Sequence, residues 1–195
     1  MKSDEKSTLR VKIREQLKSL SGEADQSKSL RICTHLEHSD YFSTSGPVLT
    51  FASLPGEPDL MPLFKKRGSQ QPFCFPRVAG SLLEIRQVTD ACDLSPGYAD
   101  IREPSLEQCP LFPIQDLRII LIPGLAYDPS TGGRLGKGKG FYDRLINDLR
   151  KTSNPLLITI GVCFDWQLTR VPEESHDQGV DAIVTENGLL TSFEC

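Results

Sequence analysis

A glycine-rich, cationic segment at positions 134–144 carries the side chains with the clearest chemical potential in this sequence. It reads Arg-Leu-Gly-Lys-Gly-Lys-Gly-Phe-Tyr-Asp-Arg, so glycines alternate with lysines. Glycine permits positive φ and lets a ligand come close to the backbone. Free N–H groups beside Arg134, Lys137 and Lys139, at the start of a helix expected from Phe141, would form an electropositive cradle. The segment therefore predicts a phosphate-bearing ligand.

Two well-known phosphate loops do not fit this segment. Its glycine spacing differs from that of a Walker A loop, and no serine or threonine follows a lysine to hold magnesium. The dinucleotide fingerprint also fails, because Gly140 follows Gly138 too closely. A surface loop with solvated lysines would have the same composition, so the flanking sequence has to decide between the two interpretations.

Further motifs follow one another along nearly the whole chain. They are Lys6-Ser-Thr-Leu-Arg10, Phe75-Pro-Arg77, Ile101-Arg-Glu-Pro104, Pro123-Gly-Leu-Ala-Tyr-Asp128, Gly161-Val-Cys-Phe-Asp-Trp-Gln167 and His176-Asp177. With the glycine-rich segment, this ordered set resembles the 5-formyltetrahydrofolate cyclo-ligase family, also called 5,10-methenyltetrahydrofolate synthetases. The resemblance implies a ligase of one-carbon metabolism. Its reaction would be the ATP- and Mg²⁺-dependent cyclisation of 5-formyltetrahydrofolate to 5,10-methenyltetrahydrofolate, releasing ADP and phosphate through a phosphorylated formyl (iminium phosphate) intermediate.

The resemblance also implies roles for individual residues. Arg134, Lys137 and Lys139 would be catalytic, by neutralising charge on the transferred phosphoryl group. Asp143 and Asp177 would hold Mg²⁺, which usually takes one or two protein carboxylates. The implied ATP-binding residues are Lys6, Arg10, Arg134, Leu135, Gly136, Lys137, Gly138, Lys139, Gly140, Phe141 and Tyr142. The implied folate-binding residues are Ala52, Glu57, Lys137, Gly138, Lys139, Gly140 and Phe141.

Several of these positions have a simpler explanation from the residues alone. Lys6 and Arg10 lie one helical turn apart, which without the resemblance predicts only a solvated helix face. Glu57 would accept hydrogen bonds from the amino and ring N–H groups of a pterin, or it would be a loop charge. Trp166 suits a ligand mouth and a core equally well. No task follows for Arg77 or Gln167.

The pattern of apolar runs predicts an α/β fold, with a single three-layer domain over residues 1–195 and a mostly parallel central sheet flanked by helices. Ligands of such sheets bind beyond the carboxyl ends of the strands. The loops 51–57, 123–140 and 163–177 should therefore converge on one site. The expected strands are 48–52, 73–78, 82–88, 117–122, 156–163 and 183–185, the expected helices are 5–19, 21–36, 59–68 and one from 141, and the proline-rich stretch 93–113 is expected to be a surface loop.

Composition limits the possible partners. A net charge of -4 over 195 residues disfavours a nucleic-acid binder, which needs a basic face. We find no apolar secretory leader and no apolar run long enough to span a bilayer, so we expect a cytoplasmic protein without membrane partners. The six scattered cysteines fit reduced thiols, and three histidines do not favour a histidine-rich metal site. Small-molecule substrates, a reduced folate and ATP, and a monomeric state are expected.

Two other functions stay open at the level of sequence. A non-catalytic protein would use the same cradle to hold folate or nucleotide for regulation or storage. Another ATP-dependent phosphoryl transferase would share the scaffold, and Glu57 would then discriminate, because a pterin-type ligand is the one that clearly requires a carboxylate there.

Overall fold

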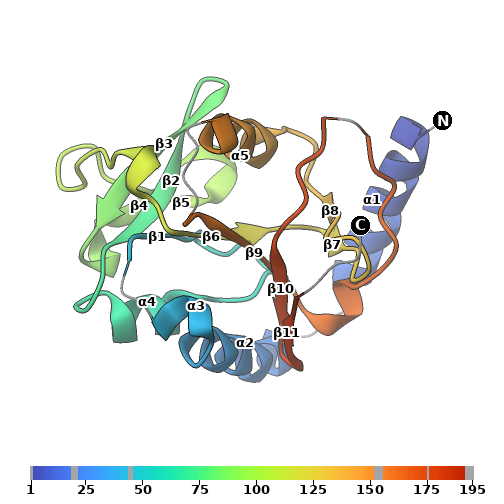
Figure 1. The fold of residues 1–195 in the computed structure, drawn as a ribbon, viewed down its shortest axis with the longest axis horizontal. Helices are drawn as coiled ribbons and strands as arrows, with labels where there is room; N and C mark the ends of the chain where they lie inside the picture. Colours follow the sequence, from blue (N-terminus) through green and yellow to red (C-terminus); the bar gives the residue numbers. More distant parts are fainter. Residues whose placement is uncertain (1, 19–21, 44–45, 152–155, 175, 192–195) are drawn as a thin grey trace.

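The computed structural model describes residues 2–18, 22–43, 46–151, 156–174 and 176–191. Figure 1 shows a central sheet with helices on both faces. The helices are α1 (Lys2–Lys18), α2 (Gly22–Glu37), α3 (Asp40–Ser43), α4 (Met61–Arg67) and α5 (Phe141–Lys151). The strands are β1 (Val48–Leu49), β2 (Phe73–Ala79), β3 (Leu82–Val88), β4 (Leu94–Pro96), β5 (Arg102–Pro104), β6 (Ile119–Pro123), β7 (Ala126–Tyr127), β8 (Arg134–Leu135), β9 (Ile158–Val162), β10 (Ala182–Thr185) and β11 (Gly188–Leu190).

The central sheet has the strand order β11-β10-β9-β6-β1-β2-β3. The neighbours from β10 to β2 pair in parallel, whereas β11 and β3 pair antiparallel at the two edges. The prediction of a mostly parallel sheet is therefore confirmed. Parallel strands bring their carboxyl ends to one edge, and that edge positions the site described below.

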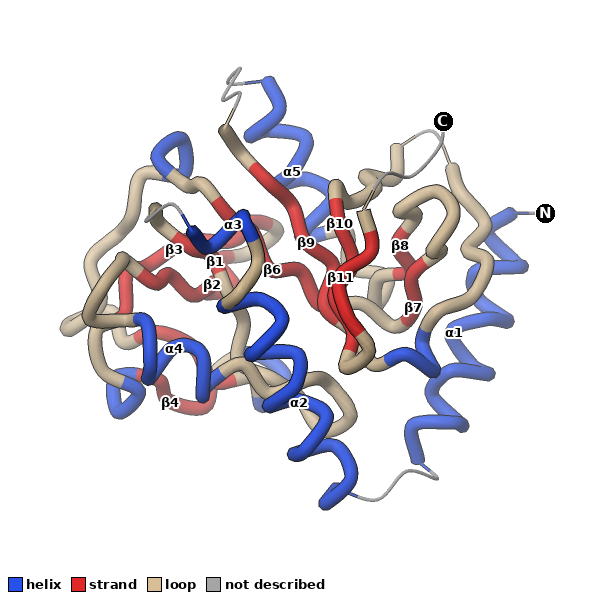
Figure 2. Tube along the Cα trace, turned by 60° about the horizontal axis from the view of Figure 1, so that its bottom comes forward, coloured by secondary structure: helices blue, strands red, loops and turns tan. Residues whose placement is uncertain are grey.

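Alternating side chains of β6 divide the core into two layers. Leu121 joins the cluster under α2, α3 and α4, to which Leu36 of α2 belongs. Ile122, the next residue, joins the cluster on the opposite face, where Ile146 of α5 is fully buried. Figures 1 and 2 show α5 on one side of the sheet and α2, α3 and α4 on the other. The central strands are thus covered on both faces, as their continuous apolar runs predict.

Helix α1 packs beside the sheet and covers neither of its faces. Its residue Ile13 is buried in a separate cluster with Leu125, Leu135 and Val171, next to the short β7–β8 hairpin. Figure 1 shows α1 alongside β7 and β8. This docking brings the basic residues near the start of the chain to a segment more than a hundred residues away in sequence.

The structure corrects several predicted boundaries. Strand β1 is shorter than the expected 48–52. The backbone N–H of Thr50 donates to the Cys74 carbonyl, and the chain leaves the ladder after this bond. Phe51 and Ala52 are nevertheless buried. The stretch 93–113 is not only loop, since it contains the antiparallel pair β4–β5. We did not predict α3, β7, β8 or β11, which are too short to show a period. Ser19, Leu20 and the expected cap Ser21 lie outside the described residues.

Two expectations from composition can be compared with the described part of the chain. Five of the six cysteines lie among the described residues, and all five are free. Burial raises the pKa of Cys33 to about 11 and that of Cys74 to about 12, so both are protonated thiols at neutral pH. None of the described helices combines the length and the apolar character needed to cross a membrane.

Candidate active site

Two adjoining pockets share the glycine-rich segment as a common wall. The polar pocket, of about 500 Å³, extends from this segment to α1 and to residues 174 and 176–178. The apolar pocket, of about 300 Å³, extends from it to the loop after β1 and the β2–β3 hairpin. The residues that line both pockets are Arg134, Gly136, Lys139, Gly140 and Asp143. Ligands in the two pockets would therefore meet at this wall.

Every site residue predicted from the sequence lies in one or both pockets. Besides the five shared residues, the predicted residues in the polar pocket are Lys6, Arg10, Leu135, Gly138 and Asp177. Those in the apolar pocket are Ala52, Glu57, Lys137, Phe141 and Tyr142. The expected convergence of loops at the carboxyl edge of the sheet thus occurs. Lys137, for which the resemblance implies contact with both ATP and folate, lines the apolar pocket and not the polar one.

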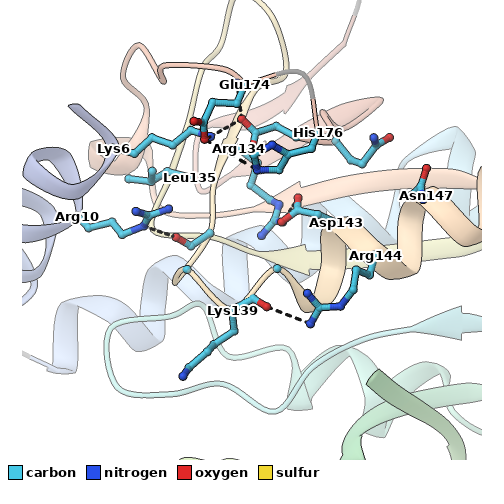
Figure 3. A pocket seen from close by; sticks show the side chains of 15 residues that line it. Lys6, Arg10, Arg134, Leu135, Lys139, Asp143, Arg144, Asn147, Glu174 and His176 are labelled. Atoms are coloured by element: carbon cyan, nitrogen blue, oxygen red, sulfur yellow. Dashed lines mark hydrogen bonds and ion pairs between the residues drawn. The ribbon is translucent and has the colours of Figure 1, made fainter. Parts of the chain in front are cut away.

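Lys6 is the most deeply buried cation of the polar pocket, with 4% of its surface exposed. Its Nζ lies 2.7 Å from Glu174 Oε2 and also donates to the Asp177 carboxylate (Figure 3). Desolvation alone would lower the pKa of Lys6, but these two acceptors outweigh it and raise the pKa. The same contact holds the pKa of Asp177 below its usual value, against the effect of burial. All three groups are therefore charged at neutral pH.

Helix α1 also contacts the glycine-rich segment directly. Arg10 lies four residues after Lys6 and donates through Nε to the Gly136 carbonyl at 3.0 Å (Figure 3). Gly138, two residues further along, has φ of +102°, a conformation that favours glycine. The shared helix face predicted for Lys6 and Arg10 is therefore turned toward the pocket and away from bulk solvent.

Arg134 and Asp143 form an ion pair within the shared wall. Arg134 Nη2 lies 2.7 Å from Asp143 Oδ1, and the Arg134 side chain is 5% exposed. The guanidinium also lies over the ring of Tyr142, 5.8 Å from its centroid. β8 holds Arg134 and the first turn of α5 holds Asp143, so the hairpin and the helix together fix the geometry of the pair.

A carboxylate-rich group in the polar pocket offers donors for a metal ion. The ligand atoms of Glu174, His176 and Asp177 lie within 4.8 Å of one another. Carboxylate oxygens are donors that Mg²⁺ prefers, so the set fits a magnesium ion bound together with phosphate oxygens. Asp143 faces the same pocket from α5 but is not part of this group. The sequence predicted Asp177 and did not single out Glu174.

The apolar pocket contains a nearly buried carboxylate. Glu57 has a side chain that is 9% exposed, and its Oε1 lies 2.5 Å from Lys137 Nζ. Its Oε2 accepts a hydrogen bond from Leu54 N at 3.0 Å, which fixes the side chain over its own loop. The rest of the wall is largely apolar and aromatic, with Phe51, Leu83, Phe141 and Tyr142 among its residues. A flat heterocycle with one hydrogen-bonding edge fits such a pocket.

Gln167 joins two loops through hydrogen bonds, a role that the sequence did not reveal. It is 1% exposed, and its Nε2 donates to the carbonyls of Gly124 and Leu125, each at 3.0 Å. Its Oε1 accepts from Phe164 N at 2.8 Å. Gln167 therefore fastens the loop after β6 to the loop after β9. No local pattern marks this task, because the two carbonyls that Gln167 bonds in the loop after β6 are more than forty residues away in sequence.

Other residues near the site also gain a position from the structure. Asn147 lines the polar pocket one helical turn after Asp143, a spacing that could have revealed it. Arg77 donates to the Pro104 carbonyl at 3.2 Å and lies 3.4 Å from Glu103. Trp166 is half-buried against two apolar clusters and lines neither of the two pockets.

Comparison with known proteins points to one family. A family model described as the 5-formyltetrahydrofolate cyclo-ligase family matches residues 2–186. The 5-formyltetrahydrofolate cyclo-ligase of Escherichia coli K12 is 28% identical over 179 residues, which cover 89% of this chain and 96% of that protein. The mouse protein of the same name is 25% identical, with 92% of each chain covered.

Solved structures agree with this result. The NMR structure of Aquifex aeolicus 5,10-methenyltetrahydrofolate synthetase matches with a TM-score of 0.83 and 29% identity, over 97% of this chain and 94% of that one. A 5,10-methenyltetrahydrofolate synthetase from Mycoplasma pneumoniae has a TM-score of 0.73 at 18% identity, covering 93% and 98% of the two chains. This second match shows the fold alone.

Proposed function

Because the chain belongs to the 5-formyltetrahydrofolate cyclo-ligase family, we propose that it converts 5-formyltetrahydrofolate to 5,10-methenyltetrahydrofolate with ATP and Mg²⁺, releasing ADP and phosphate. The family and the ligase class agree with those expected from the sequence motifs. The use of ATP, the use of Mg²⁺ and the phosphorylated intermediate are what we propose beyond the family itself.

The shared wall of the two pockets is the observation that carries this proposal. The apolar pocket suits the pterin ring, and the polar pocket, with its cations, suits the phosphates of a nucleotide. Arg134 and Lys139 line both. A group transferred from one ligand to the other would therefore pass beside two cations, which is the arrangement that phosphoryl transfer requires.

The reaction needs ATP because a formyl group on nitrogen is an amide-like, weak electrophile. In the proposed sequence the formyl oxygen bonds to the γ-phosphorus while the bond from phosphorus to the ADP oxygen breaks. The neighbouring folate nitrogen then adds to the activated carbon and loses its proton. Finally the carbon–oxygen bond breaks, and phosphate leaves with the oxygen that came from the formyl group. Catalysis consists mainly of in-line positioning and charge neutralisation.

The residues of this chain would divide these tasks between the two pockets. Lys6 and Arg10 would hold nucleotide phosphates, while Arg134 and Lys139 would neutralise the transferred group. Glu57 would accept hydrogen bonds from the pterin edge. Lys137, which the ion pair turns toward Glu57, would contact the folate side of the reacting group.

Magnesium would be held by Asp177, with Glu174 beside it and Asp143 facing the same pocket. When bound, it would neutralise part of the negative charge of the phosphates. Lys6 contacts both Glu174 and Asp177, so it would also balance the charge of this carboxylate group.

A direct assay tests the proposed function. Purified protein is mixed with 5-formyltetrahydrofolate, ATP and Mg²⁺, and the methenyl product is followed by its near-ultraviolet absorbance while ADP is quantified. We expect equal amounts of the two products, and neither when one substrate is omitted. Binding of both ligands without product would indicate a storage or regulatory protein. ADP formed without methenyl product would indicate another phosphoryl transferase.

Three further properties remain predictions. We propose that the chain works as one domain over 1–195, since both pockets are built at one edge of one sheet. We also propose a monomeric state and a cytoplasmic location. Size determination in solution and localisation of the tagged protein would test them.

A further inference from the structure

We propose that Arg144 is a positioning residue that fixes the β2–β3 hairpin against the glycine-rich segment, and thereby sets the relative placement of the two pockets. The inference rests on the proposed function, in which folate and nucleotide occupy those pockets. Arg144 would act through the residues that it holds in place, without contacting either substrate.

The first observation is a bridge between two backbone carbonyls. Arg144 donates to the Ser81 carbonyl through Nε at 3.1 Å and through Nη2 at 2.8 Å. The same Nη2 donates to the Lys139 carbonyl at 3.0 Å, which Figure 3 shows as a dashed line. Ser81 belongs to the turn between β2 and β3, and Lys139 belongs to the wall shared by the pockets. One guanidinium therefore joins two segments that are distant in sequence.

The second observation concerns the aromatic side of the apolar pocket. The Arg144 guanidinium lies over the ring of Phe141, 5.3 Å from its centroid. Phe141 in turn meets the edge of Tyr98, with ring centroids 6.4 Å apart. Both rings line the apolar pocket. Arg144 thus contacts one wall of this pocket through Phe141 and a second wall through the hairpin, which contributes Pro76, Val78 and Leu83.

The third observation is the glycine that admits the guanidinium. A Cβ atom at Gly140 would lie 3.0 Å from Arg144 Nη1, and Gly140 has φ of +66°. Any side chain there would have to displace the guanidinium and would also strain the backbone. Gly140 thus permits close approach by a side chain of the protein itself.

The chemistry of arginine explains why this residue type is needed. A planar guanidinium offers several donors in fixed directions and stacks on an aromatic ring, so it can bond two carbonyls and contact Phe141 at the same time. A lysine would keep the positive charge, but its point-like ammonium cannot reproduce both contacts. Arg144→Lys therefore separates charge from positioning.

The test compares Arg144→Ala and Arg144→Lys with wild type. Lys151→Ala is the control, because Lys151 is an exposed cation of the same helix, paired with Asp148 only one turn away. We expect both Arg144 variants to raise the KM for 5-formyltetrahydrofolate and for ATP, roughly tenfold for the alanine variant, with a smaller loss of kcat. Hydrogen exchange without ligands should accelerate in residues 79–83 and 136–141. The control should leave both KM values unchanged.

The alternatives give different results. If Arg144 simply contacted phosphate, only the KM for ATP would rise, and the positioning role would be refuted. If it merely stabilised the fold, the melting temperature and the active fraction would fall while both KM values stayed constant, which would also overturn it. Absence of turnover by the wild type would refute the proposed function instead, and the exchange of the two segments would still decide whether Arg144 couples them.

Discussion

At the scale of single residues, the site is a set of internal ion pairs. Arg134 pairs with Asp143, Lys137 with Glu57, and Lys6 with Glu174 and Asp177. The sequence motifs assign each of these cations to a phosphate and assign Asp143 and Asp177 to a metal and Glu57 to a pterin, whereas they did not single out Glu174. Ligands that bind as proposed would replace these contacts, so the affinity of the site would be a difference between two sets of charge interactions.

The first prediction concerns Asp143. Asp143→Asn keeps an oxygen that can accept from Arg134 but removes the carboxylate charge facing the polar pocket. We expect kcat to fall roughly hundredfold and the magnesium concentration for half-maximal rate to rise. Initial rates over a magnesium titration measure both. A variant that works at the wild-type rate in limiting magnesium would remove Asp143 from the metal site.

The second prediction concerns Glu57. Glu57→Gln removes the charge from the proposed pterin acceptor, and losing a hydrogen bond of this charged type costs about 1.5–3 kcal/mol of binding free energy. Calorimetric titration should show weaker binding of 5-formyltetrahydrofolate and little change for ATP. Glu107→Gln is the matched control, because it makes the same chemical change at an exposed position outside both pockets. Weaker ATP binding with unchanged folate binding would assign Glu57 to the nucleotide.

At the scale of elements, the long periodic segments could be predicted and the short connecting ones could not. The apolar spacing of Leu145, Ile146 and Leu149 indicates α5, and all three are buried as expected. The two-residue strands β7 and β8 carry no such signal, yet they hold Arg134 in place. The sequence could not show either that α1 docks on this hairpin, because the contact depends on tertiary packing.

The third prediction concerns the glycine-rich segment as a moving element. Gly138 has φ of +102°, and a Cβ atom at this position would lie 3.8 Å from its nearest neighbour, so the obstacle to a side chain is backbone strain. In Gly138→Ala the strained backbone conformation should cost on the order of 1–3 kcal/mol of conformational energy. We expect kcat/KM to fall roughly tenfold or more as a result. Gly188→Ala is the control for backbone strain, because Gly188 also has a positive φ, of +142°, and open space around an added Cβ.

Hydrogen exchange would show whether the third prediction acts through closure over the substrates. In wild type, exchange in residues 136–140 should be slowed strongly when ATP and folate are both bound, since closure excludes water from the reactive intermediate. Slow exchange in the free protein, unchanged by both ligands, would indicate a preformed cradle and contradict the lid.

At the scale of the whole molecule, the order of the layers could be predicted from the sequence. The hydrogen bonds that join distant loops could not. Continuous apolar strands such as β6 and β9 predict a sheet covered on both faces, and turn residues predict the β2–β3 hairpin. Asp128 is an example of a long-range contact that the sequence does not reveal. It is 4% exposed and accepts hydrogen bonds from Ser130 and from Val171 N, 43 residues away along the chain.

The fourth prediction concerns the pH dependence of stability. Burial alone would raise the pKa of Asp128, but its hydrogen bonds outweigh this effect and hold the pKa below its ordinary value of 3.8. The folded state therefore binds this proton less readily than the unfolded state does. The contribution of Asp128 is complete above about pH 4 and is lost as the pH falls through the lower, folded-state pKa.

Asp128→Asn should thus lower the free energy of unfolding by about 1–3 kcal/mol at neutral pH. The difference from wild type should shrink below about pH 4. Urea unfolding at a series of pH values measures this difference. Asp116→Asn, at an exposed position, is the control and should show no comparable effect. A difference between Asp128→Asn and wild type that stays constant down to about pH 2 would contradict the linkage.

The chain has a single tryptophan, and its position makes it an optical reporter. Trp166 packs against the cluster that contains Ile13 of α1 as well as against the core of the sheet, and its indole Nε1 is buried with no hydrogen-bond partner among the described residues. Indole emission shifts to longer wavelength when water reaches the ring. Any displacement of α1, which carries Lys6 and Arg10, should therefore change the intrinsic fluorescence, so the helix that brings cations to the site can be followed in unlabelled protein.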